Sequence, residues 1–267
     1  MGVIIVVDRS PGTRKLICEI LENEGFQVES VAHIDEFVYL MKKIDNGVDL
    51  ILMEVSNAYQ ENLEYLGEIQ KKDSNIPVLL MSTCSDKHLV VKSILAGAND
   101  FILKPIQEEY FIKKVMQNLK SKTIDEDILN DGIKIDFNKY IAGEFKKAVK
   151  GKYAVLLLYI TFKDTLDRDI DNLEYYKLSE IVFNILKNKF WDTDLTIRYG
   201  SRSMIGVFPF CDEVGIDVLK TKIFSSYKNL VNDQRHLKGF EINIESASFP
   251  KDGETKSEIF DILIQEI

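Results

Sequence analysis

The chain has 267 residues, a formal net charge of −9 and 45% hydrophobic residues. This length suggests two domains of roughly 100–200 residues each, and the composition suits packed cores rather than long disordered stretches. An acidic chain is a poor nucleic-acid binder, because phosphate binding needs clustered lysine and arginine. The three cysteines are widely spaced and indicate neither a zinc site nor a disulfide framework. We expect a cytoplasmic protein without membrane contact, because the sequence shows no signal peptide and no apolar run of about 18 residues. We also expect no cofactor.

Short apolar runs alternate with helical periodicity through the first half of the chain. Repeated strand–helix units of this kind predict a doubly wound α/β fold, with a five-stranded parallel sheet covered on both faces. The expected strands are Val3–Val7, Val28–Val31, Leu50–Val55, Val78–Met81 and Phe101–Leu103. The expected helices are Pro11–Glu24, Ile34–Lys43, Glu61–Gln70, Lys87–Ala96 and Glu108–Leu119.

Polar residues stand where these strands end. Asp8 and Arg9 follow the first strand, Glu54 ends the third, Ser82 ends the fourth, and Lys104 follows the fifth. The functional crevice of an open parallel sheet lies at the carboxyl ends of its strands. These side chains are therefore predicted to form one site.

The second half has a different order of elements. The polar stretch 120–131 predicts a linker, which we place at residues 123–135 between a domain at 1–122 and another at 136–267. An α+β domain with a mixed sheet is expected, in which Tyr199–Met204 connects a hairpin. Its predicted helices are Tyr140–Val149, Asn172–Lys189 and Val214–Val231, and its predicted strands are Tyr153–Ile160, Leu195–Arg198, Ile205–Phe208 and Phe240–Ser246.

Four segments of the first half, VIIVVDRSPGTRK, DLILMEVSN, IPVLLMSTC and AGANDFILKP, together resemble the receiver domain of two-component response regulators. The resemblance implies a flavodoxin-like fold. In receivers, an acidic pair after the first strand helps to bind magnesium, and an aspartate ending the third strand accepts a phosphoryl group. A Ser/Thr and a lysine contact that group, and an aromatic residue on the fifth strand changes rotamer with it. Asp8, Ser82, Phe101 and Lys104 fit these positions.

Two positions depart from the receiver pattern. Arg9 replaces the second acid, and Glu54 replaces the phospho-accepting aspartate. Arg9 removes an oxygen ligand and adds a fixed positive charge, while the extra methylene of Glu54 misplaces its oxygen for in-line attack. Asp8 and Glu54 balance Arg9 and Lys104, so we expect no magnesium and predict that Arg9 occupies the metal's place. Glu54 either imitates the phosphorylated state or is an inert carboxylate paired with Arg9 or Lys104.

The second half is similar to GGDEF domains, the diguanylate cyclase family, over about residues 136–267. The similar segments are AVLLLYITFK, LTIRYGSRSMIGVFPF and INIESASFPKDG. Diguanylate cyclases join two GTP molecules across a homodimer with carboxylate-bound metal ions. The signature here is Gly200, Ser201, Arg202, Ser203 and Met204, which lacks both acids and the second glycine.

Further family positions are altered as well. Tyr159 and Thr161 stand at aspartate positions of the first strand, and Asp167 and Tyr176 align with the guanine-contacting residues. The family's late Lys/Arg-bearing helix is also expected to be missing before the sequence ends. These losses imply a degenerate domain without a metal site or enzyme activity.

The family's product-inhibition motif is altered too. It keeps Asp194 but has Trp191 in place of arginine, and Trp191 either stacks on a base or simply packs.

The resulting prediction is a non-catalytic pseudo-response regulator in phosphorelay or cyclic-di-GMP-related signalling, acting through protein–protein interaction. The alternatives are a sensor that binds GTP or cyclic di-GMP without turnover, and a residual phosphorelay receiver. The partner is an unidentified protein, and a homodimer is expected through the surface 87–119, unless that segment is an ordinary amphipathic helix on a monomer. A basic cluster is interpreted as a solvated helix end rather than a nucleic-acid patch: Lys146, Lys147, Lys150 and Lys152.

Overall fold

The computed structural model describes residues 3–44, 47–56, 61–72, 76–84, 86–119, 137–166, 168–190 and 194–264. The chain divides into two compact units, Met1–Ile135 and Asp136–Ile267. The predicted linker at 123–135 lies outside the described residues. Each unit has its own sheet and is considered by itself.

The first unit contains a parallel five-stranded sheet with the order β2-β1-β3-β4-β5. Its strands are β1 (Val3–Val7), β2 (Gln27–Val31), β3 (Val48–Glu54), β4 (Val78–Ser82) and β5 (Asp100–Leu103). The inner strands β1, β3 and β4 are built from apolar residues that are almost all buried, as expected for a sheet covered on both faces. The predicted doubly wound fold is thereby confirmed.

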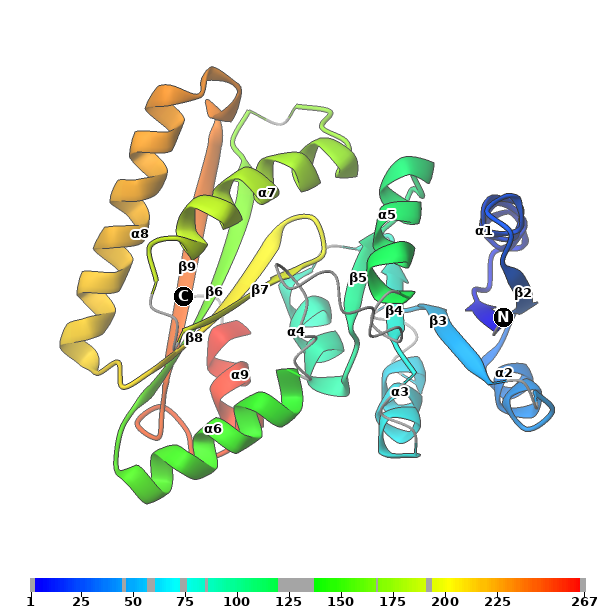
Figure 1. Ribbon diagram of the computed structural model, residues 1–267, viewed down its shortest axis with the longest axis horizontal. Coiled ribbons are helices and arrows are strands. Elements are labelled where there is room, and N and C mark those ends of the chain that lie inside the picture. The colour runs from blue at the N-terminus through cyan, green and yellow to red at the C-terminus, as the bar shows by residue number, and fades with distance from the viewer. Residues whose placement is uncertain are drawn as a thin grey trace, which may run out of the picture. The chain divides into compact units, whose positions relative to one another are not determined.

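Helices cover both faces of this sheet. Figure 1 shows α1 and α5 on one face and α2 and α3 on the other. Ser10 begins α1 by accepting a hydrogen bond from the Thr13 N–H at 3.3 Å, with Pro11 at the first helical position. The helices are α1 (Pro11–Asn23), α2 (Ile34–Met41), α3 (Glu61–Lys72), α4 (Lys87–Ala96) and α5 (Glu108–Leu119).

The second unit contains a four-stranded sheet with the order β7-β8-β6-β9. Every strand pair in its described residues is antiparallel, so the predicted mixed sheet is wrong in this respect. The strands are β6 (Val155–Asp164), β7 (Leu195–Tyr199), β8 (Ser203–Pro209) and β9 (Phe240–Phe249). The helices are α6 (Phe137–Gly151), α7 (Asn172–Lys187), α8 (Glu213–Asp233), the short 3₁₀ helix η2 (Arg235–Leu237) and α9 (Lys256–Ile264).

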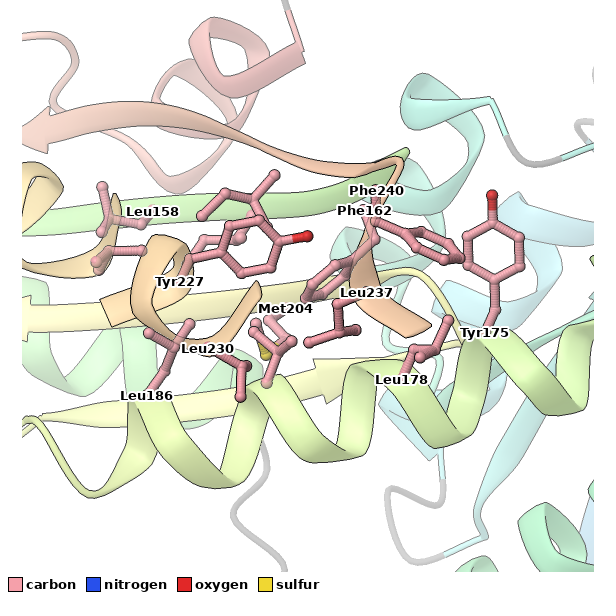
Figure 2. Close-up of a cluster of buried hydrophobic side chains, with 14 of the residues drawn as sticks. Leu158, Phe162, Tyr175, Leu178, Leu186, Met204, Tyr227, Leu230, Leu237 and Phe240 are labelled. Carbon is pink, nitrogen blue, oxygen red and sulfur yellow. The ribbon is translucent and has the colours of Figure 1, made fainter. Parts of the chain in front are cut away.

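One core of this unit lies between the sheet and the helices α7 and α8 (Figure 2). Alternate residues of β6 face it, because successive side chains of a strand point to opposite sides. They pack against apolar residues of both helices and of the neighbouring strands, among them Leu158, Phe162, Leu178, Leu186, Met204, Tyr227, Leu230 and Phe240. α6 and α9 pack against the sheet as well, and the Phe145 and Phe249 rings stack at 4.1 Å.

The last helix was not predicted from the sequence. α9 begins at Lys256 and follows a turn in which Glu258 accepts hydrogen bonds from the Glu254 and Thr255 N–H groups. These bonds hold the pKa of Glu258 below its usual value. The sequence analysis expected only the family's late Lys/Arg-bearing helix to be missing. The described part of α9 carries one basic residue, Lys256, so that expectation stays a prediction.

The α5 face differs from the surface expected for a homodimer. The aromatic and apolar residues predicted to lie on it are all at most 2% exposed and belong to the core: Phe101, Tyr110, Phe111 and Val115. Even Lys114 is buried, in an ion pair with Asp100 at 2.6 Å. The described part of α5 is thus an ordinary amphipathic helix, and the apolar support for dimerisation through it is lost.

Candidate receiver site

The predicted site residues of the first unit come together at the carboxyl ends of its strands. Lys104 Nζ lies 2.6 Å from Asp8 Oδ2 and 2.6 Å from Glu54 Oε1. The Asp8 side chain is fully buried, and those of Lys104 and Glu54 are 8% and 17% exposed. A buried carboxylate is costly without a partner, and the Lys104 ammonium group is the shared ion-pair partner of both acids.

Arg9 does not take the place that the sequence suggested. It is exposed, and its backbone N–H donates to Glu54 Oε2 at 3.0 Å. The cation between the two carboxylates is Lys104, so the prediction that Arg9 occupies the metal's place is wrong. A lysine carries a compact charge that can lie between two acids, whereas Arg9, the second residue after β1, is in the turn into α1 and is exposed.

Ser82 and Phe101 lie where the receiver pattern predicts. Ser82 is fully buried, its Oγ accepts from the Cys84 N–H at 3.1 Å, and its carbonyl accepts from the Lys104 N–H at 2.7 Å. The peptide bond from Lys104 to Pro105 is cis. Phe101 is 2% exposed and points into the core.

Two residues at this edge were missed by sequence reasoning. Asn62 is buried and donates from Nδ2 to the Glu54 carbonyl at 2.7 Å, and Arg14 donates to the carbonyls of Asp8 and Arg9. Both fix the backbone that carries the acids. Only their polar character within amphipathic helices could have pointed to them, and many surface residues share that signal.

The residues at the carboxyl edge of this sheet are a poor fit for magnesium, which requires several hard oxygen ligands in octahedral geometry. The two carboxylates already contact Lys104, and the Arg9 backbone N–H donates to the second oxygen of Glu54. Across the residues that the structure covers, no group of three His, Cys, Asp or Glu side chains is placed to hold a metal ion. No helix in the same part of the chain is long and apolar enough to cross a membrane.

The signature segment of the second unit lies in the β7–β8 hairpin, as predicted. Tyr199 pairs with Ser203, and the turn between them is Gly200, Ser201 and Arg202. Gly200 has φ 65°, a conformation that favours glycine. The Tyr159 and Ser203 hydroxyls are 3.0 Å apart, so two positions where the GGDEF pattern has acids are joined by a buried hydrogen bond.

Arginine–tyrosine stacks connect this hairpin to α7. The Arg198 guanidinium lies 3.6 Å from the Tyr176 ring centroid, and the Arg202 guanidinium lies 4.0 Å from that of Tyr175. Tyr176 is fully buried. Met204, the last signature residue, belongs to the core in Figure 2.

Only some of the remaining candidate residues are among those that the structure describes. Trp191 and Asp167 lie outside the described residues. Asp194 is half-buried, and its charge is a minor contribution to the raised pKa of Tyr140, which burial mainly causes. The predicted inhibitory pair of Trp191 and Asp194 therefore stays a prediction.

A parallel sheet in this order, with an acid pair and a lysine at its carboxyl edge, defines a receiver-type domain. The family model of the response regulator receiver domain matches residues 4–116. The chain is 31% identical over 119 residues to the chemotaxis protein CheY of Treponema pallidum, covering 44% of this chain and 82% of that protein. It is 28% identical over 117 residues to CheY of Bacillus subtilis, which covers 43% of this chain and 96% of that protein. A crystal structure of a response regulator from Thermotoga maritima shares 28% identity and covers 45% of this chain and 98% of its own, with a TM-score of 0.42.

The chain therefore belongs to the response regulator receiver family through its first unit. The family match ends at residue 116 and does not reach the second unit.

Proposed function

We propose that the protein is a non-catalytic pseudo-response regulator that acts by binding another protein. The observation that carries this proposal is the closed ion-pair cluster at the receiver edge, in which Lys104 contacts both Asp8 and Glu54. Phosphoryl transfer depends on a positioned aspartate and a divalent ion. Glu54 has the wrong length, and Arg9 removes a ligand that the ion would need.

The second unit is proposed to be a degenerate GGDEF-like domain without cyclase activity. The hairpin position of the signature segment supports this assignment, as does the order of strands and helices around it. Metal-dependent GTP chemistry needs carboxylates at the signature and on β6. Tyr159, Arg202 and Ser203 supply none.

The stacked arginines also oppose nucleotide binding without turnover. Tyr176, which aligns with a guanine-contacting position, is buried under Arg198 and cannot reach a base without unstacking. We therefore favour a protein partner over GTP or cyclic di-GMP. A second copy of the chain is the first partner to test, although α5 gives no apolar support for it.

The receiver part of the proposal is tested by intact mass spectrometry after incubation with acetyl phosphate and magnesium. We expect no phosphoryl adduct on the wild-type chain. The variant Arg9→Asp/Glu54→Asp restores the family's acids and should gain one adduct, which shows that the assay can detect it. A stoichiometric adduct on the wild-type chain would refute the proposal.

The cyclase part is tested by incubating the pure chain with GTP and magnesium and by calorimetric titration with GTP and with cyclic di-GMP. We expect no cyclic di-GMP and no binding heat. The single replacement Arg202→Asp should not create activity, because metal binding needs several oxygen ligands at once. Product formation above a protein-free blank would overturn this part.

A further inference from the structure

An exposed aromatic pair lies where α6 ends and where β8 ends. Phe210 follows β8, is 70% exposed, and stacks on Tyr153 with ring centroids 4.0 Å apart. Val149, in the last turn of α6, is 66% exposed. Single exposed apolar residues are common on protein surfaces, so exposure alone indicates no function.

The backbone at this pair is strained. Lys152 and Phe210, with φ of 54° and 61°, are the non-glycine residues in the left-handed region within the described part of the chain. Lys152 has a structural reason, because it ends α6 in a turn where the Tyr153 N–H donates to the Ala148 carbonyl at 3.2 Å. Phe210 ends no helix, and a bulky side chain is unfavourable in this region. Strain of this kind is concentrated at functional sites.

Tyr153 is a fixed support for the Phe210 ring. Its hydroxyl donates to Glu144 Oε1 at 2.7 Å, and Glu144 is 5% exposed and also pairs with Lys147 at 3.0 Å. Burial, followed by the hydrogen bond to Glu144, raises the pKa of Tyr153 to about 12, so the phenol keeps its proton at neutral pH. The ring therefore holds Phe210 from one side and leaves it open to solvent on the other.

The surroundings of this pair are positively charged. Lys146, Lys150 and Lys152 are exposed and have no ion pair with any residue that the structure describes. Three acids lie nearby. Glu144 is engaged by Lys147 and Tyr153, Asp212 caps α8 through the Gly215 N–H at 2.9 Å, and Asp194 is a half-buried residue near Cys211. Unpaired lysines around an exposed aromatic ring are complementary to an acidic partner with an apolar side chain.

We propose that a basic aromatic face binds an acidic segment of a partner protein, which places an apolar side chain on the free side of Phe210. This face consists of Lys146, Val149, Lys150, Lys152, Tyr153 and Phe210. The inference rests on the proposed function, because it names the chemistry of the partner that a non-catalytic regulator needs. A membrane is a poorer occupant, since α6 buries its apolar side, Ile141, Phe145 and Ala148, in the core. A nucleic acid is disfavoured by the net charge of −9.

The test is selection of a random peptide library, displayed on phage, against the full chain, followed by anisotropy titration of the enriched peptides. We expect enriched sequences that combine glutamate or aspartate with an aromatic or aliphatic residue, and whose affinity falls as salt is raised. The charge-reversal variant Lys146→Glu/Lys150→Glu/Lys152→Glu should weaken them by at least about tenfold. A matched control, Lys220→Glu/Lys228→Glu on α8, should leave binding unchanged.

Phe210→Gly separates binding from folding. Glycine relieves the strained backbone, so the thermal midpoint should stay within a few degrees while peptide binding is lost. Enriched peptides that are not acidic, peptides that bind the variants equally well, or no enrichment at all would overturn the proposal. So would tighter binding to phosphatidylserine vesicles or to a DNA duplex than to any peptide. None of these results alters the phosphorylation and cyclase outcomes, which test the proposed function separately.

Discussion

At the scale of single residues, the central feature is the shared use of one lysine by two acids. Lys104 is nearly buried and contacts Asp8 and Glu54 at equal distances of 2.6 Å. Glu54 thereby has both oxygens occupied, one by Lys104 and the other by the Arg9 N–H. This arrangement favours an inert, paired carboxylate over a free imitation of phosphate. The polar residues at the strand ends predicted this cluster. Which cation lies between the two acids depends on side-chain geometry, which the spacing of residues along the sequence does not show.

Replacing Lys104 tests this feature directly. Lys104→Met should lower the free energy of unfolding by about 3 kcal/mol, because it leaves two carboxylates close together without a cation. Urea unfolding of the full chain, followed by circular dichroism, measures the change. Adding Glu54→Gln to this variant should recover part of the loss.

The matched control for this prediction is Lys15→Met. Lys15 pairs with Glu19 at 3.7 Å, but both side chains are more than half exposed. Such pairs contribute less than about 1 kcal/mol. An equal loss in both variants would show that the buried cluster has no special role in stability.

At the scale of elements, the connection from β6 to α7 is organised by Asp164. This carboxylate accepts from the Leu166 and Arg168 N–H groups and from the Arg168 guanidinium, with the shortest contact at 2.6 Å. The Thr165 N–H and hydroxyl then donate to the Gly239 carbonyl next to β9. The hydrogen bond from the Arg168 side chain, followed by those from the backbone, holds the pKa of Asp164 below its usual value.

This pKa gives a pH dependence with a definite sign. A carboxylate with a lowered folded-state pKa stabilises the fold above its unfolded pKa of about 4, and that contribution is lost as pH falls through the folded value. Asp164→Asn should therefore destabilise the protein at pH 7, and the difference from wild type should shrink below about pH 4. Urea unfolding at several pH values measures it.

Asp169→Asn is the control for Asp164, because Asp169 is exposed in the same connection. It should be nearly neutral at every pH. A constant difference between Asp164→Asn and wild type across the pH range would contradict the assigned role of the charge.

The elements also show where sequence patterns are sufficient. Pro11 after a serine cap predicted the correct start of α1, and helical periodicity at 87–96 and 108–119 predicted both ends of α4 and α5. α9 was missed although its start carries a sequence signal: Thr255 and Glu258 form a capping box, in which the Glu258 N–H donates to Thr255 Oγ1 and the Thr255 N–H donates to Glu258 Oε2. The all-antiparallel second sheet could not be told from a mixed one, since hydrophobic runs carry no strand direction. The burial of Tyr110 and Phe111 likewise depends on how α5 is rotated against the sheet.

At the scale of the whole molecule, the proposed function is that of a regulator whose receiver is fixed in one state by its own charges. A ligand shifts an equilibrium between two states only if it binds them with different affinity, and under the proposed function phosphate is not such a ligand. Assembly should then depend on partner concentration and not on a phosphodonor. The basic aromatic face favours a partner whose contact surface is acidic.

Sedimentation velocity with and without acetyl phosphate and magnesium tests this claim most directly. The wild-type chain should sediment identically under both conditions at every concentration. The variant Arg9→Asp/Glu54→Asp, which regains the family's acids, is the comparison that shows whether the fold can still respond. A phosphodonor-dependent change in the mass of the wild-type protein would show that its site still switches and would contradict the account.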